Sequence, residues 1–170
     1  MADVRHPAAL SPDQLRARCK ETRTRRSGPG GQHRNKVETA IVLLDPETGI
    51  SAEAGERRSQ AENRKAALFR IRLNLALEHR EEFSRNENPS ELWTSRCRGG
   101  RLSINPSHEH FPSLLAEALD VIVACDWDVS AAAERLCVTT SQLVRLLRHE
   151  PRALALVNGE RQQRALRPLK

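Results

Sequence analysis

The chain has 170 residues, a length typical of one domain or of one small domain with a smaller second unit. Its 28 lysines and arginines exceed its 22 acidic residues and give a net charge of +6, whereas only 3% of the residues are aromatic. No apolar run approaches the ~20 residues of a membrane span, and the N-terminus lacks the apolar stretch of a signal peptide, so we expect a cytoplasmic protein that binds no membrane. We also expect a monomer.

Short-range patterns in the first half predict helices, strands and one loop. Ser11 and Ser59 each precede a Gln or Glu by three residues, as in a capping box, so a short helix is expected after Ser11 and a long one from Ser59 to about Arg80. Alternating or β-branched residues predict strands over 19–25, 37–44 and 50–54. Turn residues at 45–49 predict that the last two strands form a β-hairpin. The Gly- and Pro-rich residues 27–36 predict a loop.

The second half predicts helices after a polar boundary. Residues 81–106 are polar and contain Pro and Gly, so we expect a first domain over 1–85, a linker over 86–110 and a helical unit over 111–170. Within this unit, residues 128–148 resemble a helix-turn-helix, for which a small bundle without a ligand is the alternative. Trp127 is expected to be a core residue, whereas the role of Trp93 stays open.

Basic charge is concentrated in two segments. Residues 16–36 contain eight basic residues and one acidic residue, and residues 145–170 contain seven and two. The residues between them, 103–144, contain six acidic residues and one basic residue. This separation indicates a phosphate-rich partner.

The cysteines and histidines form no metal-binding pattern. None of the four cysteines belongs to a CxxC pair, and no histidine stands at zinc-finger spacing from them. We therefore expect reduced thiols, with no metal and no cofactor.

The loop over 27–36 contains Gly30, Gly31 and Gln32 between basic residues. The two glycines permit positive φ angles and a close approach of another molecule to the backbone. This arrangement suits a nucleic-acid end or a phosphate-bearing ligand, but an ordinary hairpin connection is the alternative from the glycines alone. No GxxxxGK[ST] sequence is present, so the loop is not a P-loop.

A longer pattern resembles the catalytic domain of class I peptide chain release factors. It spans roughly Leu15 to Arg80, and its matching residues are Gly30, Gly31, Gln32, Asn35, Lys36, Thr48-Gly49-Ile50, Arg58-Ser59-Gln60 and Asn63-Arg64. The resemblance implies an α+β fold, namely a GGQ domain with a small mixed β-sheet and one long helix, followed here by the all-α, helix-turn-helix-like unit.

The resemblance also implies an activity and a set of site residues. The activity is hydrolysis of the peptidyl-tRNA ester on the large ribosomal subunit, with Gly30, Gly31 and Gln32 as catalytic residues. A backbone N–H of Gln32 is expected to donate to the oxyanion that forms when water attacks. The residues expected to bind rRNA or tRNA are Arg25, Arg26, His33, Arg34, Asn35, Lys36, Arg57, Arg58 and Arg64, together with Arg145, Arg148, Arg161 and Arg164 of the helical unit.

The chain is most similar to the short, codon-independent members of this family, which rescue stalled ribosomes. Stop-codon-reading members carry a separate decoding domain with a PxT or SPF tripeptide, for which 170 residues are expected to leave no room. Some rescue factors end in a Lys-rich tail, whereas residues 145–170 contain six arginines and one lysine. A non-enzymatic RNA- or DNA-binding protein, using the basic loop and the helix-turn-helix-like unit, is the alternative function.

Overall fold

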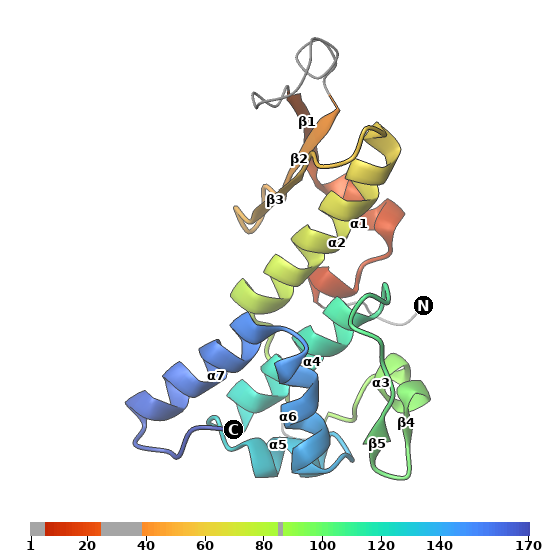
Figure 1. Cartoon of the computed structure of the whole chain (residues 1–170). Coiled ribbons are helices and arrows are strands. Elements are labelled where there is room, and N and C mark those ends of the chain that lie inside the picture. Colours follow the sequence, from red (N-terminus) through yellow and green to blue (C-terminus); the bar gives the residue numbers. More distant parts are fainter. Residues whose placement is uncertain (1–5, 25–38, 85–86) are drawn as a thin grey trace. The chain divides into compact units, whose positions relative to one another are not determined.

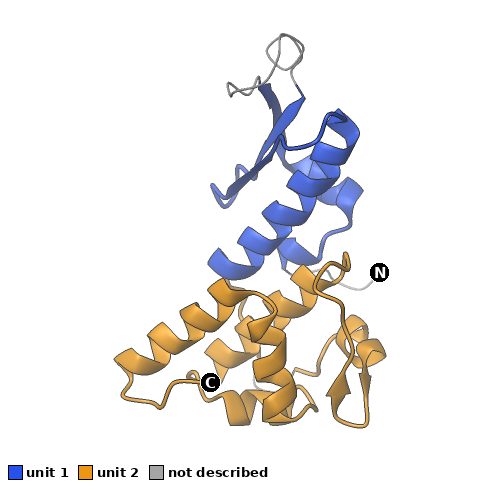
Figure 2. Ribbon diagram, viewed as in Figure 1, with its two compact units in different colours: residues 1–79 blue, residues 80–170 orange. Residues whose placement is uncertain are grey.

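The computed structural model describes residues 6–24, 39–84 and 87–170, which form two compact units (Figures 1 and 2). Unit 1 comprises Met1–His79 and unit 2 comprises Arg80–Lys170. The division lies a few residues before residue 85, where the sequence placed the end of the first domain.

Unit 1 begins with a 3₁₀ turn, η1 (Pro7–Ala9), and the predicted short helix, α1 (Pro12–Arg18). The capping box at its start is confirmed. The Ser11 hydroxyl accepts from the Gln14 N–H at 3.3 Å, and the Gln14 side chain accepts from the Ser11 N–H at 3.0 Å. The buried side chain of Leu15 anchors the helix in the core.

The sheet of unit 1 has three described strands, β1 (Lys20–Thr24), β2 (Ala40–Leu44) and β3 (Ser51–Ala54). Both pairings, β1 with β2 and β2 with β3, are antiparallel, so the expected mixed sheet is wrong for these strands. The turn between β2 and β3 is far too short for the crossover that a parallel pair needs. Gly49 in this turn has φ of 73°, a conformation that glycine adopts without strain.

The long helix α2 (Gln60–Glu78) packs on β2 and β3 (Figure 1). The Ser59 hydroxyl accepts from the Glu62 N–H, which confirms the predicted start. Ala67, Ile71 and Leu75 are fully buried and share one helical face. Ile41 and Leu43 are also fully buried, as the alternation in β2 predicts, so these two faces form the core of unit 1.

A buried carboxylate joins α1 to the β2–β3 turn. Arg18 donates from Nε and Nη2 to the two oxygens of Asp45, each at 2.8 Å, and the Thr48 hydroxyl donates to Asp45 at 2.7 Å. Burial alone would raise the pKa of Asp45, but the hydrogen bonds and the charge of Arg18 outweigh it and lower the pKa.

Unit 2 begins with structure where the sequence predicted a linker. Residues 86–110 contain a short helix, α3 (Glu91–Arg96), and a hairpin of β4 (Cys97–Arg98) and β5 (Arg101–Leu102). Trp93 explains the difference, because its side chain is only 1% exposed and its Nε1–H donates to the Leu136 carbonyl at 2.8 Å. This contact, with a residue distant in sequence, makes the segment part of a folded unit.

Residues 111–170 are helical, as predicted. The helices are α4 (Phe111–Ala124), α5 (Val129–Arg135), α6 (Thr140–Arg148) and α7 (Pro151–Gln163). A short turn joins α5 to α6, so these helices come in the order that the helix-turn-helix resemblance predicts. Cys137 has φ of 54° after α5, and Val138 N–H returns to the Ala133 carbonyl at 3.0 Å, as in a Schellman motif.

An ion pair connects the start of unit 2 to α4. Arg80 donates to Asp120 at 3.1 Å, and the Glu81 N–H donates to the same carboxylate at 3.3 Å. Burial raises the pKa of Asp120 to about 6, although Arg80 opposes the shift. The ionised carboxylate is therefore less stable in the folded chain than in the unfolded one.

This shift predicts a pH dependence for the stability of unit 2. Between about pH 4, the ordinary pKa of an aspartate, and pH 6 the folded state binds more protons at Asp120, so this residue's contribution to stability falls as pH rises. The difference in unfolding free energy between the wild type and Asp120→Asn should fall by about 1–3 kcal/mol from pH 4 to pH 7. Tryptophan fluorescence during urea unfolding measures it, because Trp93 and Trp127, the only tryptophans, both lie in unit 2. A constant difference across this range would contradict the prediction.

Candidate functional site

The GGQ residues and their basic neighbours lie outside the described residues. These are Gly30, Gly31 and Gln32, with Arg25, Arg26, His33, Arg34, Asn35 and Lys36, all within residues 25–38. The structure describes the strand on each side of this segment. Thr24 at the end of β1 pairs with Ala40 at the start of β2, so the described residues on the two sides of this segment lie next to each other in the sheet.

Asn63 of α2 bonds to Thr39, the residue before β2. Its side chain is fully buried, and its Nδ2 donates to the carbonyls of Thr39 at 2.7 Å and Arg57 at 2.9 Å. Its Oδ1 accepts from the Arg57 N–H at 2.9 Å. One amide therefore joins the residue before β2 to the connection between β3 and α2.

Arg64, the next residue of α2, pairs with a residue of β1. Its Nε and Nη2 donate to the two carboxylate oxygens of Glu21 in β1, at 2.7 and 2.8 Å. This two-point pairing is the strong form of an arginine–carboxylate contact, and it lowers the pKa of Glu21. The described contacts of Arg64 thus connect α2 to β1, and its expected contact with RNA stays a prediction.

The sequence pointed to Asn63-Arg64 as part of a motif and to Arg64 as an RNA contact, but not to these structural roles or to Glu21. The feature of the sequence that indicates these roles is the adjacent pair of polar residues before the apolar part of the helix. Two polar residues on neighbouring helical positions face about 100° apart, so they reach different strands of one sheet.

Arg57 and Arg58 are exposed in the connection between β3 and α2. Within the described residues neither side chain has an ion-pair partner, whereas nearby Arg70 pairs with Glu56 at 2.6 Å. The carboxylate of Glu56 is therefore engaged by Arg70. Arg57 and Arg58 remain the described basic candidates of unit 1 whose charge is not compensated.

The four basic candidates of unit 2 differ in their environment. Arg161 donates to the carbonyls of Trp127 at 2.6 Å and Arg167 at 2.9 Å, and Arg164 pairs with Glu160 at 2.6 Å and lies 5.3 Å from the centre of the Trp127 ring. Trp127 is half-buried by this arrangement rather than lying in the core. Arg148 donates to the Lys170 carbonyl, whereas Arg145 is exposed on α6.

One PxT string does occur in the chain, as Pro46-Glu47-Thr48. The structure places it in the turn between β2 and β3 rather than in a separate domain. Thr48 donates to Asp45 and accepts from the Ile50 N–H at 3.3 Å, so its hydroxyl stabilises the turn. These contacts engage the hydroxyl within the protein.

Two kinds of site are not found in the part of the chain that the structure describes. Its histidines, cysteines and carboxylates form no cluster of three or more that could hold a metal ion. Its helices include none that is both long and apolar enough to span a membrane.

A family model, the RF-1 domain, matches residues 12–103, from α1 to the end of β5. The chain belongs to the RF-1 domain family. The match includes the GGQ sequence, the strands on both sides of it and the Asn63-Arg64 pair of α2. Residues 104–170, with helices α4 to α7, lie beyond the part that this RF-1 domain model matches.

Curated relatives of this RF-1 domain protein are peptide chain release factors. Peptide chain release factor 1 of Streptococcus thermophilus is 33% identical over 128 residues, which cover 71% of this chain and 35% of that protein. Peptide chain release factor 2 of Helicobacter pylori is 31% identical over 118 residues, or 67% and 32% of the two chains. The mouse protein "Peptide chain release factor 1-like, mitochondrial" is 38% identical over 73 residues, or 43% and 18%.

The chain covers only part of the length of each of these relatives. It spans about a third of the length of the two bacterial release factors. No solved structure matches it significantly.

The contacts of Asn63 predict a large effect of its removal. Asn63→Ala removes three part-buried hydrogen bonds to the backbone of Thr39 and Arg57, which should lower the unfolding free energy of unit 1 by about 2–4 kcal/mol. Asn74→Ala is the matched control on the same helix, because Asn74 donates to the Ser51 carbonyl at a more exposed position and should cost less than about 1 kcal/mol. Thermal unfolding followed by circular dichroism compares them, and equal losses would contradict the assigned role.

Proposed function

We propose that the chain hydrolyses the ester between a nascent peptide and tRNA on the large ribosomal subunit. The observation that carries this proposal is the RF-1 domain match over residues 12–103, with Gly30-Gly31-Gln32 between basic residues. The named activity of the curated relatives, peptide chain release, supports the same reaction.

The residue types in this segment suit catalysis by positioning. Attack of water on the ester carbonyl forms an oxyanion, to which a backbone N–H of Gln32 donates in the proposed mechanism. The Gln32 side chain is neutral and orients water but is a poor base. Residues 27–36 contain no Asp or Glu, so the proton passes to groups of the tRNA or the ribosome rather than to a carboxylate of the loop.

Unit 1 supports this proposal through the strands on both sides of the GGQ segment. Asn63 and Arg64 together make five hydrogen bonds, to Glu21 in β1, to Thr39 before β2 and to Arg57 after β3. A fixed base lowers the entropy that must be lost when a catalytic segment takes up its working position. Exposed Arg57 and Arg58 are proposed to contact RNA phosphates beside this segment.

We further propose that release is independent of the codon and rescues stalled ribosomes. The PxT string of this chain supports this, because Thr48 stabilises the β2–β3 turn through Asp45 and Ile50. Residues 165–170 also pack against α7, where the Asn158 side chain bonds to both the N–H and the carbonyl of Leu169, at 2.7 and 3.1 Å. Recruitment is therefore proposed to depend on the folded surface of unit 2 rather than on an extended basic tail.

Two variants at one position test the oxyanion contact. Gln32→Pro removes the backbone N–H and should lower the release rate by about 10²–10³-fold, whereas Gln32→Ala keeps the N–H and should lose less. Release of labelled peptide from stalled ribosomes measures both rates. Cosedimentation with ribosomes is the control for binding, and unchanged release in both variants would refute the mechanism.

Codon independence predicts equal release on different messages. Three ribosome complexes carry the same peptidyl-tRNA, with a stop codon, a sense codon or a truncated message at the empty site. We expect release from the truncated complex at least as fast as from the stop-codon complex, because no residue of the chain is proposed to read a codon. Release only at the stop codon would show a codon-reading factor and overturn the rescue proposal.

A further inference from the structure

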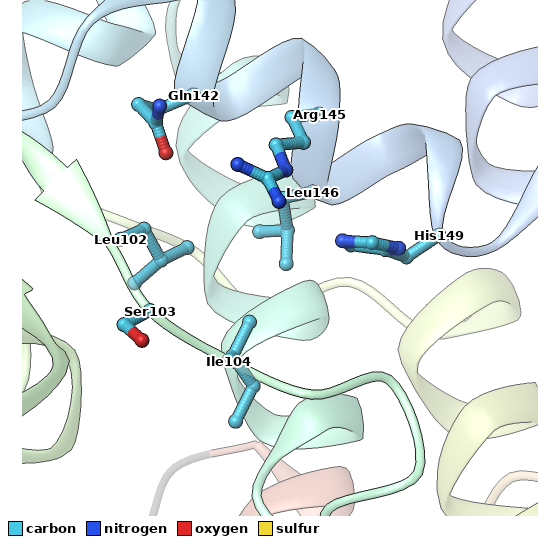
Figure 3. A pocket seen from close by; sticks show the side chains of 7 residues that line it. All are labelled: Leu102, Ser103, Ile104, Gln142, Arg145, Leu146 and His149. Atoms are coloured by element: carbon cyan, nitrogen blue, oxygen red, sulfur yellow. The ribbon is translucent and has the colours of Figure 1, made fainter.

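A small pocket in unit 2 lies between α6 and the extended segment that continues β5 (Figure 3). Its volume is about 130 Å³. One wall consists of Leu102, Ser103 and Ile104, and the other consists of residues at α6, namely Gln142, Arg145, Leu146 and His149. It is smaller than the ~300–1,000 Å³ typical of sites for drug-sized ligands, which favours a group the size of a single phosphate.

The polar groups of the pocket share one side of α6. Gln142, Arg145 and His149 are separated by three and four residues, so they lie above one another on the helix. Figure 3 shows their side chains on the side of α6 that faces the Leu102–Ile104 segment. An amide, a guanidinium and an imidazole together offer several N–H donors, which is the chemistry that recognises phosphate oxygens.

The charge of this surface is uncompensated in the described structure. Arg145 is exposed and has no ion-pair partner within residues 6–24, 39–84 and 87–170. The helix α6 itself contains no Asp or Glu. In contrast, Arg152 of the next helix pairs with Glu150 at 2.8 Å. The charge of Arg145 is therefore available beside the pocket.

The β4–β5 hairpin carries two further arginines. Arg98 and Arg101 lie opposite each other in the hairpin and are both exposed. The Gly100 carbonyl accepts from the Thr139 N–H at 3.3 Å, and Thr139 is the N-cap of α6. Leu102 of β5, the residue after Arg101, also lines the pocket, so the hairpin that carries these two arginines is continuous with one wall of the pocket.

We propose that the pocket binds a phosphate of an RNA backbone, with Arg145 as the main contact and Gln142 and His149 as further donors. Arg98 and Arg101 contact neighbouring phosphates of the same RNA. The choice of RNA rather than DNA rests on the proposed function at the ribosome. The contacts follow the backbone rather than base edges, because the major groove of A-form RNA is too narrow to admit a helix.

The test measures binding of the full chain to a fluorescently labelled RNA hairpin by anisotropy, at several salt concentrations. Arg145→Glu should weaken binding about tenfold or more, whereas Arg152→Glu, the control with the same change of charge, should weaken it less than about threefold. Arg145→Ala should also reduce the slope of log Kd against log salt by about one. Gln142→Ala should weaken binding without changing that slope, because it removes no charge.

Three results would overturn the proposal. Equal losses in the Arg145 and Arg152 variants would show a non-specific charge effect. Tighter binding to a DNA duplex of the same sequence would assign the surface to DNA, and binding to an acidic peptide but not to the RNA would assign it to a protein. Tryptophan fluorescence confirms that each variant has folded, since both tryptophans lie in unit 2.

The failure of this inference is separable from failure of the proposed function. An RNA affinity that does not respond to Arg145→Glu refutes the pocket and does not concern the ester hydrolysis. A release rate that does not respond to Gln32→Pro refutes the mechanism and does not concern the pocket. The two results come from different assays and from variants in different units.

Discussion

The hydrogen bonds of two adjacent residues in α2 control the geometry around the GGQ segment. Asn63 bonds to Thr39 and Arg57, and Arg64 bonds to Glu21, so one helix holds both strands from which residues 25–38 extend. Asn63 is fully buried, and its amide is stable there only because both of its polar atoms have partners. Since α2 is itself fixed by its apolar face on the sheet, the position of the segment's base depends on the core of unit 1.

In unit 2, the helix α6 contacts several neighbouring elements, as α2 does in unit 1. This helix packs against α4, α5, α7 and β5 through one buried face. Leu143, Leu146 and Leu147 supply the buried contacts and are each at most 2% exposed. The side that stays open carries Gln142 and Arg145 and faces the pocket beside the hairpin. The packing of the helix therefore determines which of its polar residues are available to a partner.

The basic residues of unit 2 show why net charge is a poor guide to a binding surface. Arg161 and Arg164 belong to a basic segment, yet their guanidinium groups contact Trp127. Arg161 donates to its carbonyl, and Arg164 lies over its ring. Arg145 belongs to the same segment and is exposed without a described ion-pair partner. The same residue type thus stabilises the fold at one position and offers charge at another, and only the distances to its neighbours distinguish the two.

The sequence by itself determined the features that depend on neighbours within a few positions. Caps at Ser11 and Ser59, the turn at Gly49, the helix-turn-helix and the ordered motifs of the RF-1 domain family are of this kind, because capping, periodicity and turn chemistry act locally. Only the tertiary structure decided the antiparallel pairing of β1 with β2, the burial of Trp93 and the pairing of Arg64 with Glu21, which is 43 residues away. These features depend on contacts between distant segments, and the positions of such segments are set by packing of the whole core rather than by local sequence.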